Sequence, residues 1–419
     1  MDQICIIGGR PLEGTVEVGG AKNAALPILA ACLLGGGDCE IDHVPQVRDV
    51  STMVKLLQLL GVTVQGQGGR YTLNAETVQS VVAPYELVKT MRASILSLGP
   101  LLARLGEAKV SLPGGCAIGT RPVNLHLKGL EMMGAEIQVE HGYIHAKAAR
   151  LHGTRIDLDF PTVTGTENLI MAACLAEGTT SLHNVAREPE IGDLCAFLTK
   201  RGAKIHGVGT DTISIEGVRA LHGARHWVMP DRVEAGTYLM AGAITGGDMM
   251  VRGCVTDHIG SVLKKLQETG VNLIEEQEGV RIRRTGSLRS ADVKTLPYPG
   301  FPTDLQAQMM ALMSIAEGTS VLTETIFEGR FLHVPELHRM GASIEVDGPH
   351  AVIKGVAALT GAPVMASDLR ASAGLVLAGL AAEGETVISR VYHLDRGYEK
   401  LEEKLGALGA NINRIRETP

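Results

Sequence analysis

The sequence predicts an α/β protein of two domains, built from six copies of one βαβαββ-like unit. The first observation is a short motif, Gly-x-x-Ile/Leu/Val, which recurs at the end of each unit's second helix. The six glycines are Gly61, Gly134, Gly202, Gly270, Gly341 and Gly409. Neighbouring copies lie 68 to 73 residues apart, and such regular self-similarity is typical of a structural repeat.

The second observation is that the first helix of a unit consists mainly of small apolar residues. The first and last copies show this most clearly, in Ala24, Ala25, Ala30, Ala31, Ala371, Ala373, Gly374, Ala378 and Gly379. Small side chains allow neighbours to approach from most directions, so we expect buried helices with sheets packed outside them. Three such helices make one domain, and six units therefore make two.

The third copy illustrates the expected elements in order. Apolar residues at helical spacing predict a helix over 166–177, which Gly178 ends. A strand over 179–185 follows, then an amphipathic helix over 191–201 that Gly202 ends, then a strand over 203–208. An extra strand completes the unit.

The chain of 419 residues is longer than one hydrophobic core normally serves. Pro230 marks the expected boundary. We expect residues 22–229 to form the first domain, and residues 1–21 with 230–419 to form the second, because the strand before Lys22 has no place in the first three units. The active site is expected in the cleft between the two domains.

Composition excludes several classes of function. The net charge of −7 argues against a general polyanion binder, and an aromatic content of 3% argues against base stacking. We therefore expect no nucleic-acid partner. Seven cysteines without regular spacing suggest free thiols in a reducing compartment rather than disulfides or a zinc site.

Targeting and cofactor motifs are missing from the sequence. The apolar runs are too short to span a bilayer, and the first residues do not resemble a signal peptide, so we expect a cytoplasmic protein without membrane insertion. The sequence contains no GxGxxG, GxxxxGK[ST], GxSxG or HExxH. We expect neither a metal nor a cofactor, and a scaffold role for His126, His333 and His393.

Polar residues recur where the buried helices begin. They are Lys22, Asn23, Arg92, Thr166, Glu167, Asn168, Glu234, Asp304 and Arg370. Acidic residues at these positions are expected to be helix caps, whereas a cation there is disfavoured unless an anion binds nearby. Lys22, Arg92 and Arg370, joined by Arg121, Arg330 and Arg396, therefore predict a ligand with several negative groups, with Asp304 as the carboxylate among them.

A glycine-rich loop presents a single thiol. Cys116 lies between Gly114, Gly115 and Gly119, in a segment that ends at Arg121. The glycines predict an exposed loop, and the neighbouring cation favours the thiolate. An ordinary free cysteine in a turn is the alternative interpretation of the loop taken alone.

Four motifs resemble the enolpyruvyl transferase family, in its branch that acts on UDP-N-acetylglucosamine, over essentially the whole chain. They are Gly19-Gly-Ala-Lys22-Asn23-Ala-Ala-Leu-Pro27, Pro113-Gly-Gly-Cys116-Ala-Ile-Gly-Thr-Arg121-Pro122, Pro299-Gly-Phe-Pro-Thr-Asp304-Leu-Gln306, and Asp368-Leu-Arg370-Ala-Ser-Ala-Gly374. The resemblance implies a two-domain inside-out α/β barrel. It also implies transfer of the enolpyruvyl group of phosphoenolpyruvate to the 3-hydroxyl of UDP-N-acetylglucosamine with release of phosphate, which begins peptidoglycan synthesis.

The resemblance also assigns residue roles. Asp304 would act as the base, Cys116 as the acid that fosfomycin alkylates, and Lys22 as a further catalytic residue. Phosphoenolpyruvate would contact Lys22, Asn23, Arg121, Arg330, Arg370 and Arg396. The nucleotide sugar would contact Asn23, Arg92, Arg121, Pro122, Val123, Asn124, Leu125, Asp304 and Ile326.

Two departures from the family pattern and two rival functions stay open. Asn124 replaces a common Asp, and Thr162-Val-Thr-Gly-Thr166 replaces a common Ser-Val-Gly-Ala-Thr. The sister transferase of the shikimate pathway shares the fold and the phosphoenolpyruvate chemistry. A non-catalytic ring that encircles DNA would also show internal repetition, but it would need an extensive basic lining.

Overall fold

The computed structural model describes residues 2–112 and 123–416, and these form two compact units. Unit 1 contains residues 2–19 and 230–416, and unit 2 contains residues 20–112 and 123–229. Each unit has its own hydrophobic core. The α/β class and the repeated architecture are confirmed, because the described residues form six four-stranded sheets with one common strand order.

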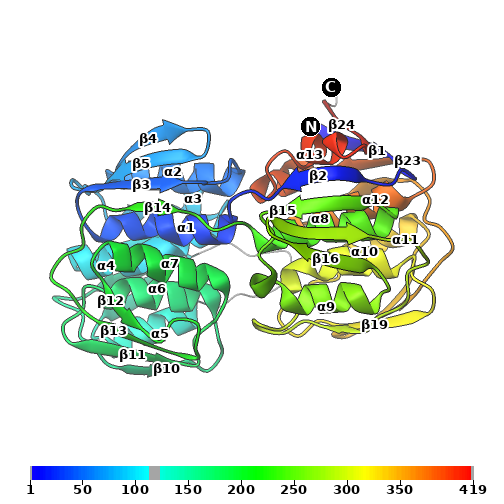
Figure 1. Cartoon of the computed structure of the whole chain (residues 1–419). Helices are drawn as coiled ribbons and strands as arrows, with labels where there is room; N and C mark the ends of the chain where they lie inside the picture. Colours follow the sequence, from blue (N-terminus) through cyan, green and yellow to red (C-terminus); the bar gives the residue numbers. More distant parts are fainter. Residues whose placement is uncertain (1, 113–122, 417–419) are drawn as a thin grey trace. The chain divides into compact units, whose positions relative to one another are not determined.

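Each sheet combines one parallel pair of strands with two antiparallel pairs, and it lies on the outside of its unit (Figure 1). In β18-β19-β21-β20, for example, Val293 of β18 is parallel to Leu322 of β19, and Val321 pairs with Val352 in the antiparallel direction. Alternate residues of the strands are buried, so one face of each sheet covers the helices.

The strands of unit 2 belong to three sheets. The first contains β14 (Arg225–Trp227), β3 (Asp38–Asp42), β5 (Arg70–Asn74) and β4 (Thr63–Gln67). The second contains β6 (Val82–Ala83), β7 (Glu107–Ser111), β9 (Tyr143–Lys147) and β8 (Glu136–Glu140). The third contains β10 (Arg155–Asp157), β11 (Thr179–His183), β13 (Thr212–Glu216) and β12 (Lys204–His206).

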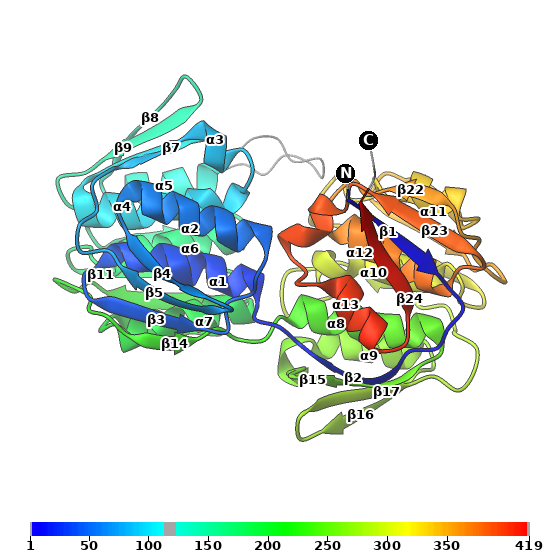
Figure 2. The same ribbon diagram turned by 90° about the horizontal axis from the view of Figure 1, so that it is seen from above.

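The strands of unit 1 repeat this order with help from the start of the chain. The first sheet contains β16 (Asn272–Glu276), β17 (Gly279–Arg283), β15 (Asp248–Arg252) and β2 (Glu13–Glu17). The second contains β18 (Val293–Lys294), β19 (Thr319–Thr323), β21 (His350–Lys354) and β20 (Ser343–Asp347). The third contains β22 (Pro363–Met365), β23 (Glu385–Ser389), β1 (Asp2–Ile7) and β24 (Asn411–Arg416). Strand β1 lies between β23 and β24 (Figure 2), and β2 is parallel to β15.

Each repeat has a buried first helix and an amphipathic second helix. The buried helices are α1 (Lys22–Ala31), α4 (Leu98–Leu105), α6 (Val163–Ala173), α8 (Arg232–Thr245), α10 (Gln306–Met313) and α12 (Leu369–Ala381). The second helices are α2 (Arg48–Leu60), α5 (Asn124–Met132), α7 (Pro189–Lys200), α9 (Gly260–Glu268), α11 (Val334–Arg339) and α13 (Leu401–Ala407). Small residues let the buried helices pack closely: a Cβ on Gly374 of α12 would lie 2.8 Å from the main-chain oxygen of Ala307 in α10.

Short helices complete the chain. They are α3 (Tyr85–Val88) and the 3₁₀ helices η1 (Cys32–Leu34), η2 (Arg92–Ser97), η3 (Thr256–His258), η4 (Thr303–Leu305) and η5 (Val391–Arg396). Two of them, η2 and η4, directly precede the buried helices α4 and α10, so that Arg92 and Asp304 lie in a tighter turn at the helix start.

The six glycines that mark the repeats share one backbone conformation. Each follows the second helix of its repeat with a positive φ, between 88° and 102°. Only glycine adopts this left-handed conformation without a steric penalty, and it ends the helix. The sequence signal therefore comes from one geometric requirement that is repeated six times.

The elements predicted in the third repeat are correct in type and order but not in their ends. Helix α6 spans Val163–Ala173 rather than 166–177, because Thr162 caps it by accepting a hydrogen bond from the Gly165 N–H. The three-residue strand β10 is too short to be recognised from alternation alone.

We predict that Gly355→Ala lowers the free energy of unfolding by about 3 kcal/mol, the upper end of the usual cost of overpacking. A Cβ on Gly355, which follows β21, would lie 1.6 Å from the main-chain oxygen of Ala316. Urea unfolding of the variant tests this. Gly286→Ala is the control, because no atom lies within 4 Å of the added Cβ, and an equal effect of both changes would contradict the prediction.

Candidate active site

Asp304 holds two buried arginines together in unit 1. Arg330 donates from Nη2 to Oδ1 of Asp304 and Arg370 from Nη2 to Oδ2, both at 2.8 Å. Each arginine is only 4% exposed, whereas the Asp304 side chain is 27% exposed. Three of the residues selected from the sequence therefore meet in one ion-paired group that solvent reaches at the carboxylate.

Helix α12 positions Arg370 at its second residue. Asp368 caps the helix by accepting hydrogen bonds from the main-chain N–H groups of Arg370, at 2.9 Å, and Ala371, at 3.1 Å. Burial alone would lower the pKa of Arg370, but the negative charge of Asp304 raises it above its ordinary value. The guanidinium therefore stays charged although it is buried.

A polar network behind this group joins the three buried helices of unit 1. Gln308 donates to the main-chain oxygen of Asp304 at 3.2 Å and to the hydroxyl of Tyr398 at 3.1 Å, and Tyr398 is within 2.9 Å of the Thr237 hydroxyl. The guanidinium of Arg370 lies 5.7 Å from the centre of the Tyr398 ring. The network thus contacts both Asp304 and Arg370.

Arg396 and Ile326 lie in neighbouring segments of unit 1. Arg396 is the last residue of η5, which packs on α12, and it is half-buried. Ile326 lies in the connection between β19 and Arg330, and its N–H donates to Glu324 at 2.8 Å. Sequence reasoning missed Glu324, Gln308 and Tyr398; of the supporting residues, only Asp368 carries a recognisable signal, as a cap before a helix.

Unit 2 places Lys22 and Arg92 at helix starts, as their sequence positions suggested. Lys22 is the first residue of α1, which has no side-chain cap, and its Nζ lies 3.4 Å from Oδ2 of Asp49. Asn23 follows and is half-buried. Arg92 begins η2, which packs on both α1 and α6.

His126 connects α5 to α6 as a neutral, hydrogen-bonded residue. The amide of Asn168 donates to Nδ1 of His126 at 3.1 Å while its oxygen accepts from the Gly99 N–H, which fixes the amide orientation. The proton of His126 is therefore on Nε2, which faces the Thr164 hydroxyl at 3.3 Å. Burial first, and then the charge of Arg92, lowers the pKa of His126 to about 4.

This network lies beside the residues expected to contact the nucleotide sugar. Val123 precedes α5, and Asn124 and Leu125 are its first two residues. Thr164 belongs to the segment that departs from the family pattern, and its hydroxyl is the group that reaches His126. The departure thus supplies a hydrogen-bonding side chain behind α5.

The expectation that acidic residues at the helix starts serve as caps is wrong for Glu234. The cap of α8 is Asp231, which accepts from the N–H groups of Val233 and Glu234. The carboxylate of Glu234 instead accepts from the Gly19 N–H at 2.6 Å and from Lys404 at 2.7 Å. It anchors residue 19 and α13 to the start of α8.

Cys116, Arg121 and Pro122 lie outside the described residues. Among the cysteines that the structure describes, Cys5 is partly exposed and the others are buried. Burial raises the pKa of the Cys174 thiol well above its ordinary value, and it raises the pKa of Cys195 to about 12. These two thiols are poor nucleophiles at neutral pH.

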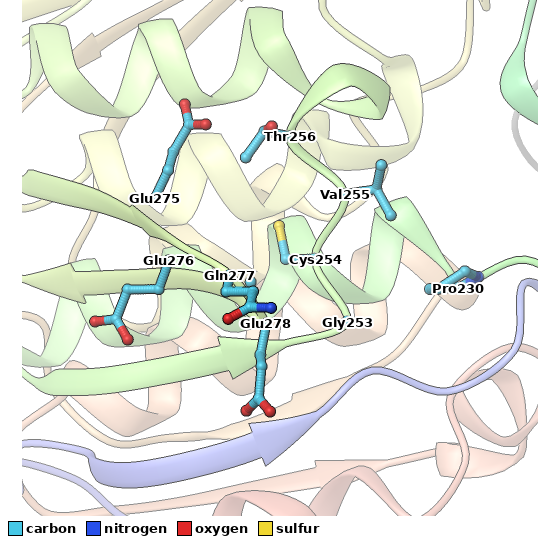
Figure 3. A pocket seen from close by; sticks show the side chains of 10 residues that line it. Pro230, Gly253, Cys254, Val255, Thr256, Glu275, Glu276, Gln277 and Glu278 are labelled. Carbon is cyan, nitrogen blue, oxygen red and sulfur yellow. The ribbon is translucent and has the colours of Figure 1, made fainter.

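A separate hollow of about 360 Å³ lies in unit 1 (Figure 3). It is lined by Pro230, Gly253, Cys254, Val255, Thr256, Glu275, Glu276, Gln277, Glu278 and Gly279. Burial, with a contribution from Glu275, raises the pKa of Cys254 to about 12, so this thiol is not activated. No residue of the predicted site is among those that line the hollow.

Residues 2–112 and 123–416 contain neither a cluster of metal-binding side chains nor a membrane-spanning helix. No group of three His, Cys, Asp or Glu side chains there is arranged to hold a metal ion. No helix of the described chain is both long and apolar enough to cross a membrane.

Comparison with known proteins identifies the family. The family model of EPSP synthase (3-phosphoshikimate 1-carboxyvinyltransferase) matches residues 6–405. UDP-N-acetylglucosamine 1-carboxyvinyltransferase of Gluconacetobacter diazotrophicus is 59% identical, and the alignment covers 100% of both chains. The chain belongs to the enolpyruvyl transferase family. The Koribacter versatilis protein of the same name is 57% identical, with 100% of this chain and 97% of the other covered.

Solved structures of enolpyruvyl transferases agree with this fold. The enolpyruvyl transferase NikO from Streptomyces tendae superposes with a TM-score of 0.89 at 25% identity, covering 99% of this chain and 98% of NikO. EPSP synthase from Acinetobacter baumannii gives 0.77 at 20% identity, covering 99% and 100%. The family membership makes this enolpyruvyl transferase an enzyme, which contradicts the alternative of a non-catalytic protein.

We predict that His126→Gln makes stability less dependent on pH between pH 6.5 and about 4. In the wild type the unfolded chain gains a proton on His126 near pH 6.5 and the native state only near pH 4. Native stability is therefore lost as the pH falls through this window, by at most about 1.4 kcal/mol per pH unit.

Urea unfolding at several pH values measures this slope. His206→Gln is the control, since His206 is exposed at the end of β12. A slope for His126→Gln equal to that of the wild type would contradict the prediction.

Proposed function

We propose that this enolpyruvyl transferase transfers the enolpyruvyl group of phosphoenolpyruvate to the 3-hydroxyl of UDP-N-acetylglucosamine. The reaction adds the hydroxyl to C2 of phosphoenolpyruvate and then eliminates phosphate, which is the first committed step of peptidoglycan synthesis. Identities of 57–59% over the full chain to enzymes named for this acceptor support the choice. The identity to the EPSP synthase structure is only 20%, which supports the fold alone.

The paired arginines are the observation on which the proposal mainly rests. Arg330 and Arg370 are buried yet share a single carboxylate, and Nη1 of Arg330 is a buried donor without an acceptor in the described part of the chain. A buried unpaired N–H costs free energy, so an anionic ligand would satisfy it. The carboxylate of phosphoenolpyruvate suits this role because a guanidinium can bind it with two parallel hydrogen bonds.

Asp304 is the proposed general base. It is the most exposed of the three charged groups, and its carboxylate can accept the proton of the sugar 3-hydroxyl as that oxygen attacks C2. Two guanidinium groups stabilise its negative charge in the free protein. When the substrate carboxylate takes over part of this pairing, Asp304 becomes a stronger base, because it loses hydrogen bonds to its charged form.

The other assignments follow the matched family motifs. Lys22, Asn23, Arg121 and Arg396 are proposed to bind phosphoenolpyruvate with the arginine pair, and Cys116 to donate the proton to C3. Arg92, Val123, Asn124, Leu125 and Ile326, with Pro122, are proposed to contact the nucleotide sugar. The start of α1 supports an anion beside Lys22, because its N-cap residue, Ala21, makes no side-chain cap hydrogen bond and a helix N-terminus favours negative charge.

Phosphate release with two acceptors tests the function. We expect release from phosphoenolpyruvate with UDP-N-acetylglucosamine and none with shikimate 3-phosphate. The second acceptor is the necessary comparison, because the matching family model is described as EPSP synthase. Release only with shikimate 3-phosphate would reverse the assignment.

We predict that Asp304→Asn lowers kcat by at least about 100-fold, the usual contribution of a general base. The amide cannot accept the hydroxyl proton, whereas the nucleotide sugar keeps its other contacts. Steady-state kinetics and calorimetric binding of UDP-N-acetylglucosamine separate the two effects. Asp347→Asn, at the exposed end of β20, is the matched control, and near-normal turnover of Asp304→Asn would refute the base assignment.

A further inference from the structure

Glu324 is a buried carboxylate that joins separate segments of unit 1. It follows β19, is 4% exposed, and accepts four hydrogen bonds. Its Oε1 accepts from the Thr295 hydroxyl at 2.9 Å and from the N–H groups of Ile326 at 2.8 Å and Phe327 at 3.2 Å. Its Oε2 accepts from the Thr303 hydroxyl at 2.9 Å. Four donors match a carboxylate, which can only accept when ionised.

The joined segments carry the two ends of the Asp304–Arg330 ion pair. Thr303 is the residue before Asp304 in η4, and Phe327 lies in the segment that leads to Arg330. The guanidinium of Arg330 lies 5.2 Å from the centre of the Phe327 ring, so this segment also supports the arginine directly.

A third segment strengthens the anchor. Thr295, which follows β18, donates to Glu324, and its hydroxyl accepts from the Thr325 N–H at 2.9 Å. The Thr325 hydroxyl in turn donates to the main-chain oxygen of Thr295 at 2.5 Å. The backbone on both sides of Glu324 is therefore held against the edge of the sheet, and the carboxylate has little freedom to follow a displaced partner.

We propose that Glu324 is a positioning residue, which sets Asp304 relative to Arg330 by binding Thr303 on one side and the Ile326 and Phe327 amides on the other. Its effect on turnover rests on the proposed function, while its effect on geometry does not. Glu324 acts through its neighbours and is assigned no contact with substrate. A displacement of about 1 Å at a reacting group can cost about 100-fold in rate, so loss of this anchor is expected to reduce kcat.

Three variants test the geometry. Glu324→Ala removes all four hydrogen bonds, and we expect kcat to fall by about 100-fold. Glu324→Gln keeps an oxygen for the two N–H groups and offers its NH₂ to the Thr303 hydroxyl, which can also accept, so we expect it to restore most of kcat. Thr303→Val removes only the link to η4, and we expect an intermediate kcat; it also serves if Glu324→Ala fails to fold.

Glu317→Gln is the matched control, because Glu317 is an exposed glutamate at the opposite end of β19. Its kcat is expected to equal that of the wild type. Rates are taken per folded molecule, with the melting temperature measured for each variant, so that loss of stability is separated from loss of positioning. Equal impairment of Glu324→Ala and Glu324→Gln, or normal kcat in folded Glu324→Ala, would overturn the proposal.

A crystal structure of Glu324→Ala gives a readout that does not depend on activity. We expect the distance between Asp304 Oδ1 and Arg330 Nη2, 2.8 Å in the wild type, to exceed hydrogen-bonding range while the rest of unit 1 is unchanged. An unchanged distance would overturn the positioning role. A wild type that releases no phosphate with UDP-N-acetylglucosamine would instead overturn the proposed function and leave this measurement decisive for Glu324.

Discussion

The burial of Arg330 and Arg370 around one carboxylate is the constraint on which the rest of unit 1 depends. Two charged side chains withdrawn from water are tolerated only when partners compensate the lost hydration. Asp304 does so with one carboxylate oxygen for each of the two arginines. The surrounding groups are arranged accordingly: Asp368 caps the helix that carries Arg370, and the Tyr398 ring covers its guanidinium. The contacts that position the charges therefore also hold the buried helices together.

The repeat explains how one architecture supplies different chemistry. Equivalent helix starts present Lys22, Arg92, Asp304 and Arg370, while the helices behind them consist of similar small residues. The charge at each helix start is set by one or two residues, whereas the residues that follow fill the core. One architecture can therefore carry different charges at its helix starts, as is usual for folds that serve several reactions.

The features that could be predicted from the sequence are those that a local backbone or charge requirement determines. The six repeats were visible because each needs a glycine with positive φ after its second helix, and the charged helix starts were visible because a cation there is locally unfavourable. The supporting residues were not visible. Glu324, Gln308 and Tyr398 act through partners far away in the chain, and a lone Glu after a strand is ordinarily a solvated residue. The true cap of α8, Asp231, was missed for a simpler reason, since Glu234 stood in the same turn.

The shared fold cannot by itself select the acceptor, since NikO and EPSP synthase superpose on the same architecture. Selection must lie in side chains that contact the acceptor and in what holds them. At the start of α5 that support is a buried chain of neutral groups, in which Asn168 fixes His126 and His126 faces Thr164. Hydrogen bonds between neutral groups fix the orientation of these side chains without placing another charge close to Arg92. The positive charge of Arg92 already disfavours protonation of His126. The proposed acceptor contacts at the start of α5 are therefore shaped by directional hydrogen bonds, whereas the arginine pair proposed to bind phosphoenolpyruvate in unit 1 is shaped by charge.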